Sequence, residues 1–241
     1  MLMLASLGRP SSDFAALAAD LLAAGYAALL VDLPGVDAGA VPDHPPATLH
    51  ELAGLALEAI AEEDLPVAVV GHAFGGRVAR CLAADHPQLV RSVVVLGGGG
   101  RIPGDPEAVA ALRSCFDPAL TPEQHLEAVS RAFFAPGNDP RVWADGWWPE
   151  AAELQLRASA ATPVTDWWGA GLSPVLVVVG TEDRISPPAN GRQLVGELGG
   201  RATLVEVPGA GHALLPERPA DVSAAVIEFL RRTFPVSRDR D

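Results

Sequence analysis

Short apolar runs alternate with amphipathic segments along most of the chain. Six runs have the length and apolar content of buried strands, at 2–5, 27–31, 67–70, 92–96, 175–179 and 203–207. Uninterrupted apolar runs are typical of strands covered on both faces, and strands that alternate with helices are typical of a parallel sheet. The pattern therefore predicts an α/β fold with a mostly parallel sheet of about six strands flanked by helices.

Helical periodicity marks the segments between these runs. Apolar positions recur at helical spacing over 47–63, 74–85, 188–198 and 219–233. Ser12 and Asp13 precede a further amphipathic segment that stops at Gly25. We expect this segment to be a helix that the two polar side chains cap and the glycine ends.

Residues 101–171 interrupt the alternation. They hold many prolines, several helical pieces and no convincing strand, which predicts a helical cap inserted in a single domain spanning 1–241. All five tryptophans lie in this segment. They are Trp143, Trp147, Trp148, Trp167 and Trp168. Two interpretations are equally open: the tryptophans pack the cap against the core, or they line a substrate pocket suited to flat or aromatic ligands.

Composition narrows the classes of function. The chain has 241 residues, is 49% hydrophobic and has a formal net charge of -13, which argues against binding to nucleic acid or to anionic membrane surfaces. All 17 basic residues are arginine, so lysine chemistry is excluded. The lack of lysine, together with the many alanines, indicates a bacterial coding bias. Two cysteines, no basic N-terminal leader and no apolar run of about 20 residues lead us to expect a cytoplasmic protein.

The strongest chemical signal lies in residues 67–79, which read VAVVGHAFGGRVA. A buried strand runs into a turn bounded by Gly71 and Gly75, and an apolar-periodic helix follows. The glycines allow the backbone to make a tight, strained turn. Ala73, at the centre of the turn, is thereby presented at the N-terminus of the helix, where a developing negative charge is favoured.

This segment resembles the nucleophile elbow of the α/β-hydrolase fold, Gly-x-Ser-x-Gly, with Ala73 in the place of the serine. Three further segments resemble the same family, namely AALLVDLPG at 27–35, VLVVVGTEDRISP at 175–187 and VEVPGAGHAL at 205–214. The resemblance implies a catalytic site built from Ala73, Asp183 and His212, in the chain order that the family has. Glu182 is the alternative acid, which we consider weaker than Asp183.

The resemblance also implies an oxyanion hole formed by two backbone N–H groups, those of Phe74 and Leu7. Ser6 places a hydroxyl close to it, either to bind substrate or to cap the backbone. We expect His72 to point away from the pocket and Cys81 to be a core residue. The other histidines have no motif around them, so we interpret them as structural: His44, His50, His86 and His125.

An alanine at the elbow leaves three interpretations open. In the first, which we favour, a His212–Asp183 dyad acts without a serine on a small, largely apolar ester, lactone or carbonyl compound, by hydrolysis or by lyase or cofactor-free oxygenase chemistry. In the second, a serine esterase has been inactivated by an engineered serine-to-alanine change. In the third, the chain is a non-catalytic small-molecule binder. No metal or nucleotide motif is found, so we expect a small-molecule substrate, no cofactor and no metal, and we allow for a homodimer.

Overall fold

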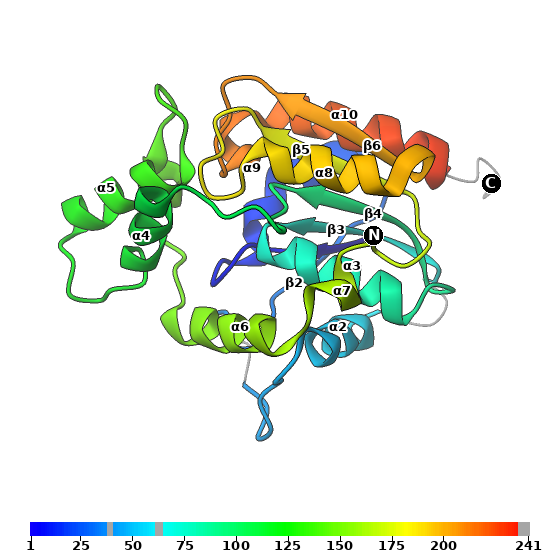
Figure 1. Cartoon of the computed structure of the whole chain (residues 1–241), viewed down its shortest axis with the longest axis horizontal. Helices are drawn as coiled ribbons and strands as arrows, with labels where there is room; N and C mark the ends of the chain where they lie inside the picture. Colours follow the sequence, from blue (N-terminus) through cyan, green and yellow to red (C-terminus); the bar gives the residue numbers. More distant parts are fainter. Residues whose placement is uncertain (38–40, 61–64, 236–241) are drawn as a thin grey trace.

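The computed structural model describes residues 1–37, 41–60 and 65–235. Six strands form one parallel sheet in the order β2-β1-β3-β4-β5-β6 (Figure 1). The strands are β1 (Leu2–Leu4), β2 (Leu29–Val31), β3 (Val67–His72), β4 (Val90–Leu96), β5 (Val175–Gly180) and β6 (Ala202–Val207). The predicted fold class and the six predicted strands are confirmed.

The two edge strands depart from the expected burial. Every residue of β1, β3 and β5 is buried, whereas β2 is exposed or half-buried and β6 has a single buried residue, Val207. The expectation that all six strands are covered on both faces was wrong for β2 and β6. The reason is their place in the sheet, because β2 and β6 are edge strands and have a neighbouring strand on one side only. The apolar runs in the sequence do not show which strands lie at the edges.

Helices cover both faces of the sheet. On one face α1 (Ala15–Ala23), α9 (Leu214–Glu217) and α10 (Pro219–Thr233) form a core with the strands. On the other face lie α2 (Leu49–Glu58), α3 (Phe74–Asp85) and α8 (Pro188–Leu198). The predicted helix at 47–63 begins after Thr48, whose side chain accepts a hydrogen bond from Glu51 N–H, and the end of that prediction lies outside the described residues.

The start of α1 differs from the expected cap. Ser12 and Asp13 lie in a 3₁₀ turn, η1 (Ser11–Phe14), and neither side chain caps a helix. The Asp13 carboxylate instead accepts two hydrogen bonds from the Arg9 guanidinium. The two opposite charges attract each other, and an uncharged backbone N–H group does not supply this attraction. Gly25 follows the helix with a φ of 88°, as the glycine was expected to do.

The segment 101–171 contains no strand. It consists of α4 (Pro106–Ser114), α5 (Pro122–Phe133), the 3₁₀ turn η3 (Pro140–Trp143), α6 (Pro149–Ala161) and α7 (Val164–Trp167). Figure 1 shows α4 and α5 standing beside the sheet, whereas α6 and α7 run past α2 and α3. No helix in the described part of the chain is long and apolar enough to cross a membrane.

Candidate active site

The turn between β3 and α3 has the strained geometry of an elbow. Ala73 has a φ of 48° and a ψ of -104°, a backbone conformation that a residue with a side chain rarely adopts. Such a conformation costs on the order of 1–3 kcal/mol and persists only where the surroundings enforce it. Ala73 N–H donates to the Leu96 carbonyl at 2.8 Å, which fixes the turn against the end of β4.

Two glycines make this turn possible. A Cβ on Gly71 would lie 2.3 Å from the Gly75 carbonyl oxygen, and a Cβ on Gly75 would lie 2.0 Å from the Leu4 oxygen. Both contacts are with backbone, so neither position has room for any other residue. Gly75 N–H also donates to the Ala5 carbonyl at 3.0 Å, which ties the loop after β1 to the first turn of α3.

An acid and a histidine meet beside the elbow. The Nδ1 atom of His212, from the loop after β6, lies 2.8 Å from Oδ2 of Asp183, from the loop after β5, and both side chains are buried. The other carboxylate oxygen of Asp183 accepts the N–H groups of Ile185 and Ser186 at 2.9 and 2.7 Å. The acid is therefore held in place by its own turn, and the neighbouring Glu182 is exposed.

Glu217 and His72 hold the loop that carries His212. One oxygen of the buried Glu217 carboxylate accepts Gly211 N–H and the other accepts Ala135 N–H, each at 2.7 Å. Burial raises the pKa of Glu217. His72 Nε2 donates to the His212 carbonyl at 2.8 Å. The bond from Gly211 to Glu217 and the bond from His72 to the His212 carbonyl fix the backbone on either side of the His212 ring.

His72 is fully buried and stays neutral. Burial, with the neighbouring His212 as a smaller cause, lowers the pKa of His72 to about 3. Its ring centroid lies 5.4 Å from that of His212 and 5.9 Å from that of Trp143. Its Nδ1 atom has no partner among the described residues, as expected for a neutral ring that donates through Nε2.

The two backbone N–H groups expected to form an oxyanion hole are unpaired. Within the described residues, neither Leu7 N–H nor Phe74 N–H donates to a protein acceptor. The loop that carries Leu7 is fixed one residue further on, because Gly8 N–H donates to the Gln155 side-chain oxygen at 2.9 Å. Ser6 is buried and directly follows Ala5, whose carbonyl accepts the hydrogen bond from Gly75 N–H.

The tryptophans of segment 101–171 lie in separate places. Trp143 and Trp147 enclose Arg9, whose guanidinium carbon lies 4.5 and 4.6 Å from their ring centroids. This Arg9 cluster (Arg9, Trp143 and Trp147) adjoins Phe133, which lies 5.3 Å from the Trp147 ring and 5.8 Å from the His212 ring. Phe133 and the Arg9 cluster therefore form an aromatic wall next to the dyad.

Trp167 and Trp168 lie elsewhere, in the hydrophobic core on the face of the sheet that α2, α3 and α8 cover. They flank the buried Arg80, whose guanidinium carbon is 4.5 and 5.5 Å from their centroids. We call this group the Arg80 cluster (Arg80, Trp167 and Trp168). Trp148 is half-buried at the start of α6, where its N–H donates to the Gly8 carbonyl. The structure thus brings two of the five tryptophans to the wall beside the dyad.

Four residues of this arrangement carry no sequence signal. They are Arg9, Phe133, Gln155 and Glu217, and none belongs to a motif. Gln155 and Glu217 each bond residues that lie at least 79 positions away. Arg9 and Phe133 contact the rings of the tryptophans. The one local hint is the spacing of Arg9 and Asp13, four residues apart. Long-range partners of this kind become visible only when the elements are assembled.

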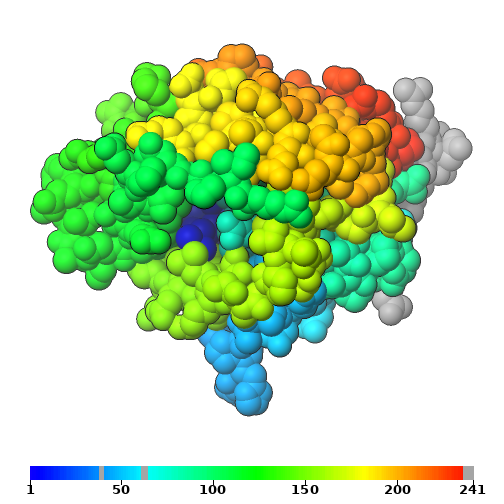
Figure 2. Space-filling view, viewed as in Figure 1, coloured from blue at the N-terminus to red at the C-terminus, as the bar shows by residue number. Residues whose placement is uncertain are grey.

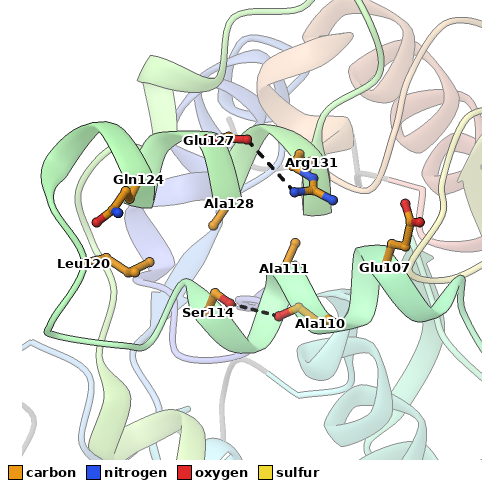
Figure 3. A pocket seen from close by; sticks show the side chains of 9 residues that line it. All are labelled: Glu107, Ala110, Ala111, Ser114, Leu120, Gln124, Glu127, Ala128 and Arg131. Carbon is orange, nitrogen blue, oxygen red and sulfur yellow. Dashed lines mark hydrogen bonds and ion pairs between the residues drawn. The ribbon is translucent and has the colours of Figure 1, made fainter.

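Figure 2 shows a hollow in the molecular surface, bordered by parts of segment 101–171 in green and yellow-green. Atoms of the N-terminal segment, in dark blue, and of the cyan segment that includes the elbow are visible at its bottom. A different concavity of about 380 Å³ lies within the cap, between α4 and α5, where Ala111 and Ala128 face each other (Figure 3). Its lining includes none of the residues predicted for the site.

The chain belongs to the alpha/beta hydrolase family, because the model of that family matches residues 1–225. Among curated proteins, a pimeloyl-[acyl-carrier protein] methyl ester esterase of Chromobacterium violaceum is 30% identical over 236 residues, which are 88% of this chain and 87% of that protein. A protein named provisionally as the carbamate hydrolase RutD, from Caulobacter sp. strain K31, is 29% identical over 179 residues, which are 67% of this chain and 64% of that protein.

The solved structures agree with the fold. The crystal structure of a Mycobacterium tuberculosis protein named provisionally as the non-heme bromoperoxidase BpoC has a TM-score of 0.79 at 23% identity and covers 96% of this chain and 91% of that one. An esterase from Thermogutta terrifontis has a TM-score of 0.74 at 23% identity, with 96% and 89% covered. The family and the relatives named as hydrolases and esterases make this chain a hydrolase-like enzyme.

Proposed function

We propose that the chain acts on a small, largely apolar or aromatic ester, lactone or carbonyl compound with a His212–Asp183 dyad and no serine nucleophile. The observation that carries the proposal is the buried 2.8 Å contact between His212 and Asp183, beside an elbow that holds Ala73 in a strained conformation. The curated relatives named as ester and carbamate hydrolases support this substrate class.

The dyad supplies a general base. Asp183 accepts the hydrogen on His212 Nδ1 and leaves Nε2 free to take a proton, as it has no protein partner among the described residues. In the hydrolytic version, His212 removes a proton from a water molecule while the water oxygen attacks the substrate carbonyl. The carbonyl oxygen becomes an oxyanion that the N–H groups of Leu7 and Phe74 stabilise. The tetrahedral intermediate then collapses, and His212 returns the proton to the departing alkoxide.

The same groups suit a second reaction of a carbonyl compound. His212 could instead take a proton from the carbon next to the carbonyl, and the resulting enolate oxygen would occupy the same two N–H groups. Ala73 bars an acyl-enzyme in either case, because its methyl side chain offers no nucleophile. The choice between the two reactions depends on the substrate, since both use the same base and the same oxyanion hole.

The retained strain at the elbow argues for a site in use. A binder that needs no oxyanion hole gains nothing from a φ of 48° at Ala73, whereas that turn is what presents Phe74 N–H. Ser6 and the aromatic wall of Trp143, Trp147 and Phe133 are our candidates for the substrate pocket. We do not include Trp167 and Trp168 in the proposed pocket, because they lie in the core. Trp148 supports the loop after β1 through the hydrogen bond from its backbone N–H to the Gly8 carbonyl. A cytoplasmic location and a homodimer stay predictions.

The test is a parallel assay of the unsubstituted chain and four single variants on short and aromatic esters and lactones, with oxygen uptake followed alongside. We expect the unsubstituted chain, with Ala73, to turn over at least one compound class and His212→Ala to lose at least about 100-fold in kcat/KM, the range a positioned general base contributes. Asp183→Asn should lose a large part of the rate as well. His44→Ala is the matched control, because the same substitution is made at an exposed loop histidine.

Full activity of His212→Ala would sink the proposal. Ala73→Ser separates the remaining interpretations. A large gain in esterase activity with serine, together with no turnover by the alanine form, would identify a serine esterase that has lost its nucleophile. Tight ligand binding that survives loss of both His212 and Asp183, with no turnover of any compound, would identify a binder.

A further inference from the structure

A second group of chemically reactive side chains lies at the far end of α3 from the elbow. His50 comes from α2, and Cys81 and Asp85 come from the last turns of α3. Their ligand atoms, His50 Nδ1, Cys81 Sγ and an Asp85 carboxylate oxygen, all lie within 4.8 Å of one another. Cys81 and Asp85 are eight and twelve residues beyond Ala73, which places the group about 12–18 Å along the helix axis from the elbow.

The three atoms have nearly the spacing of three corners of a zinc tetrahedron. His50 Nδ1 lies 2.8 Å from Asp85 Oδ2 and 3.3 Å from Cys81 Sγ, and Cys81 Sγ lies 3.6 Å from Asp85 Oδ2. Ideal Zn–N, Zn–O and Zn–S bond lengths in a tetrahedron give edges of about 3.3 Å between nitrogen and oxygen and about 3.5 Å to sulfur. An ion could therefore enter with side-chain shifts of about half an ångström.

The other nitrogen of His50 has the partner that a metal-bound histidine usually has. His50 Nε2 lies 3.4 Å from Oδ2 of Asp166, which belongs to α7. A carboxylate at this position fixes the ring orientation and leaves Nδ1 unprotonated for a metal. A metal here would therefore connect α2 and α3 directly, and α7, the last helix of the cap, through Asp166. Figure 1 shows these three helices side by side.

The burial of the group fits an ion that keeps one solvent ligand. The Cys81 side chain is buried, whereas the His50 and Asp85 side chains are 40% and 28% exposed. An ion bound to the three atoms would have sulfur on the protein side and an open fourth position toward water. The mixed set of thiolate, imidazole and carboxylate selects a borderline-soft divalent cation over Mg²⁺ or Ca²⁺, which prefer oxygen ligands alone.

We propose that His50, Cys81 and Asp85 form a Zn²⁺-type metal site that pins the end of the cap to the core. The site is independent of the dyad. Binding releases the Cys81 thiol proton to solvent and forms a metal–thiolate bond. The sequence predicted no metal because the ligands are split between two helices and His50 is 31 residues from Cys81, far from the short Cys and His spacings that mark zinc sites in a sequence.

The experiment measures Zn²⁺ and Co²⁺ binding to the full chain after treatment with a chelator. We expect one ion per chain, and with Co²⁺ the ultraviolet charge-transfer absorption of a cobalt–thiolate bond. Cys81→Ser and His50→Gln should each weaken Zn²⁺ binding by at least about 100-fold, and Asp166→Asn by about 10-fold, as loss of an outer carboxylate does. Cys115→Ser and His44→Gln are the matched controls and should bind like the natural chain.

Folding is checked separately by the melting temperature of each variant in the presence of chelator. His50→Gln changes a half-exposed side chain, so it should fold normally even if Cys81→Ser does not. Unchanged affinity in His50→Gln, or Co²⁺ binding without the thiolate absorption, would overturn the proposal. A loss of Zn²⁺ binding in Cys115→Ser would also overturn it, because Cys115 is not one of the proposed ligands. Esterase activity is not used as a readout, so failure here leaves the dyad proposal unaffected.

Discussion

The Arg9 cluster and the Arg80 cluster look alike in composition but differ in how the buried charge is compensated. Both place a guanidinium between two tryptophan rings. Arg9 is paired with Asp13 through two hydrogen bonds of 2.9 and 2.7 Å. Arg80 donates only to the carbonyls of Gly76 and Gly99, and its Nη1 has no partner within the described residues.

Burial shifts the pKa of a charged group in each cluster, namely the Arg80 guanidinium and the Asp13 carboxyl. Burial lowers the pKa of Arg80 to about 9, with the nearby Arg77 as a smaller cause. In the other cluster burial raises the pKa of Asp13, although Arg9 acts in the opposite direction. The same combination of one arginine and two tryptophans therefore occurs in two environments. In the Arg9 cluster the arginine is ion-paired and lies beside the dyad, whereas in the Arg80 cluster it is a desolvated cation within the core.

The largest effect is expected from breaking the Arg9 pair. Arg9→Met leaves the Asp13 carboxylate buried and unpaired, so we expect a loss of about 3–5 kcal/mol in the free energy of unfolding, as for other broken buried pairs. Urea denaturation at neutral pH measures it. The double variant Arg9→Met/Asp13→Asn should recover most of the loss; equal stability of single and double variants would contradict the pairing argument.

The second prediction concerns pH, because the Arg9 cluster contacts a neutral histidine and the Arg80 cluster does not. The pKa of His72 is about 6.5 in an unfolded chain, and burial lowers this pKa to about 3 in the folded protein. Between these values the unfolded state binds the extra proton, so stability falls as pH is lowered, by at most about 1.4 kcal/mol per pH unit.

The measurement is the free energy of unfolding from pH 7 to pH 4. His72→Gln keeps a donor for the His212 carbonyl and should flatten this slope, while His44→Gln, at an exposed position, should leave it unchanged. An identical slope in His72→Gln and the natural chain would show that His72 is not the group responsible.

Arg80→Met should cost less than Arg9→Met, despite the complete burial of Arg80. The substitution removes a desolvated cation together with its hydrogen bonds and leaves the Gly99 carbonyl without its donor. We expect a net loss of about 1–2 kcal/mol, close to that of one unsatisfied buried group. A loss as large as that of Arg9→Met in the same denaturation series would remove the distinction between the clusters.

The smallest effect is expected at the surface edge of the Arg80 cluster. Arg101 lies 4.8 Å from the Trp168 centroid and bonds Glu197 at 2.9 Å, with both charged side chains about 40% exposed. Arg101→Gln should cost at most about 1 kcal/mol, because water and salt screen exposed pairs. The loss should shrink further in 1 M NaCl; an effect that salt does not change would indicate packing rather than charge.

Local sequence patterns defined the strands and the elbow. The apolar runs marked all six strands, and Gly71 and Gly75 marked a turn that only glycine can make. The expected cap at Ser12 and Asp13 was wrong, because Arg9 competes for the Asp13 carboxylate and a charged partner wins over backbone N–H groups. A capping preference read from neighbouring residues fails where the side chain has a stronger partner, here Arg9, that the capping pattern does not include.

By itself, the sequence determined the α/β fold class, the tight turn at Ala73 and the candidates Asp183 and His212, since each is encoded in a few consecutive residues. Only the tertiary structure decided which strands are edges, which tryptophans reach the dyad, and that Glu217, Gln155 and His72 fix the loops around it. It alone also brought His50 to Cys81 and Asp85. These contacts join residues far apart in the chain, and the packing of helices on the sheet sets their distances.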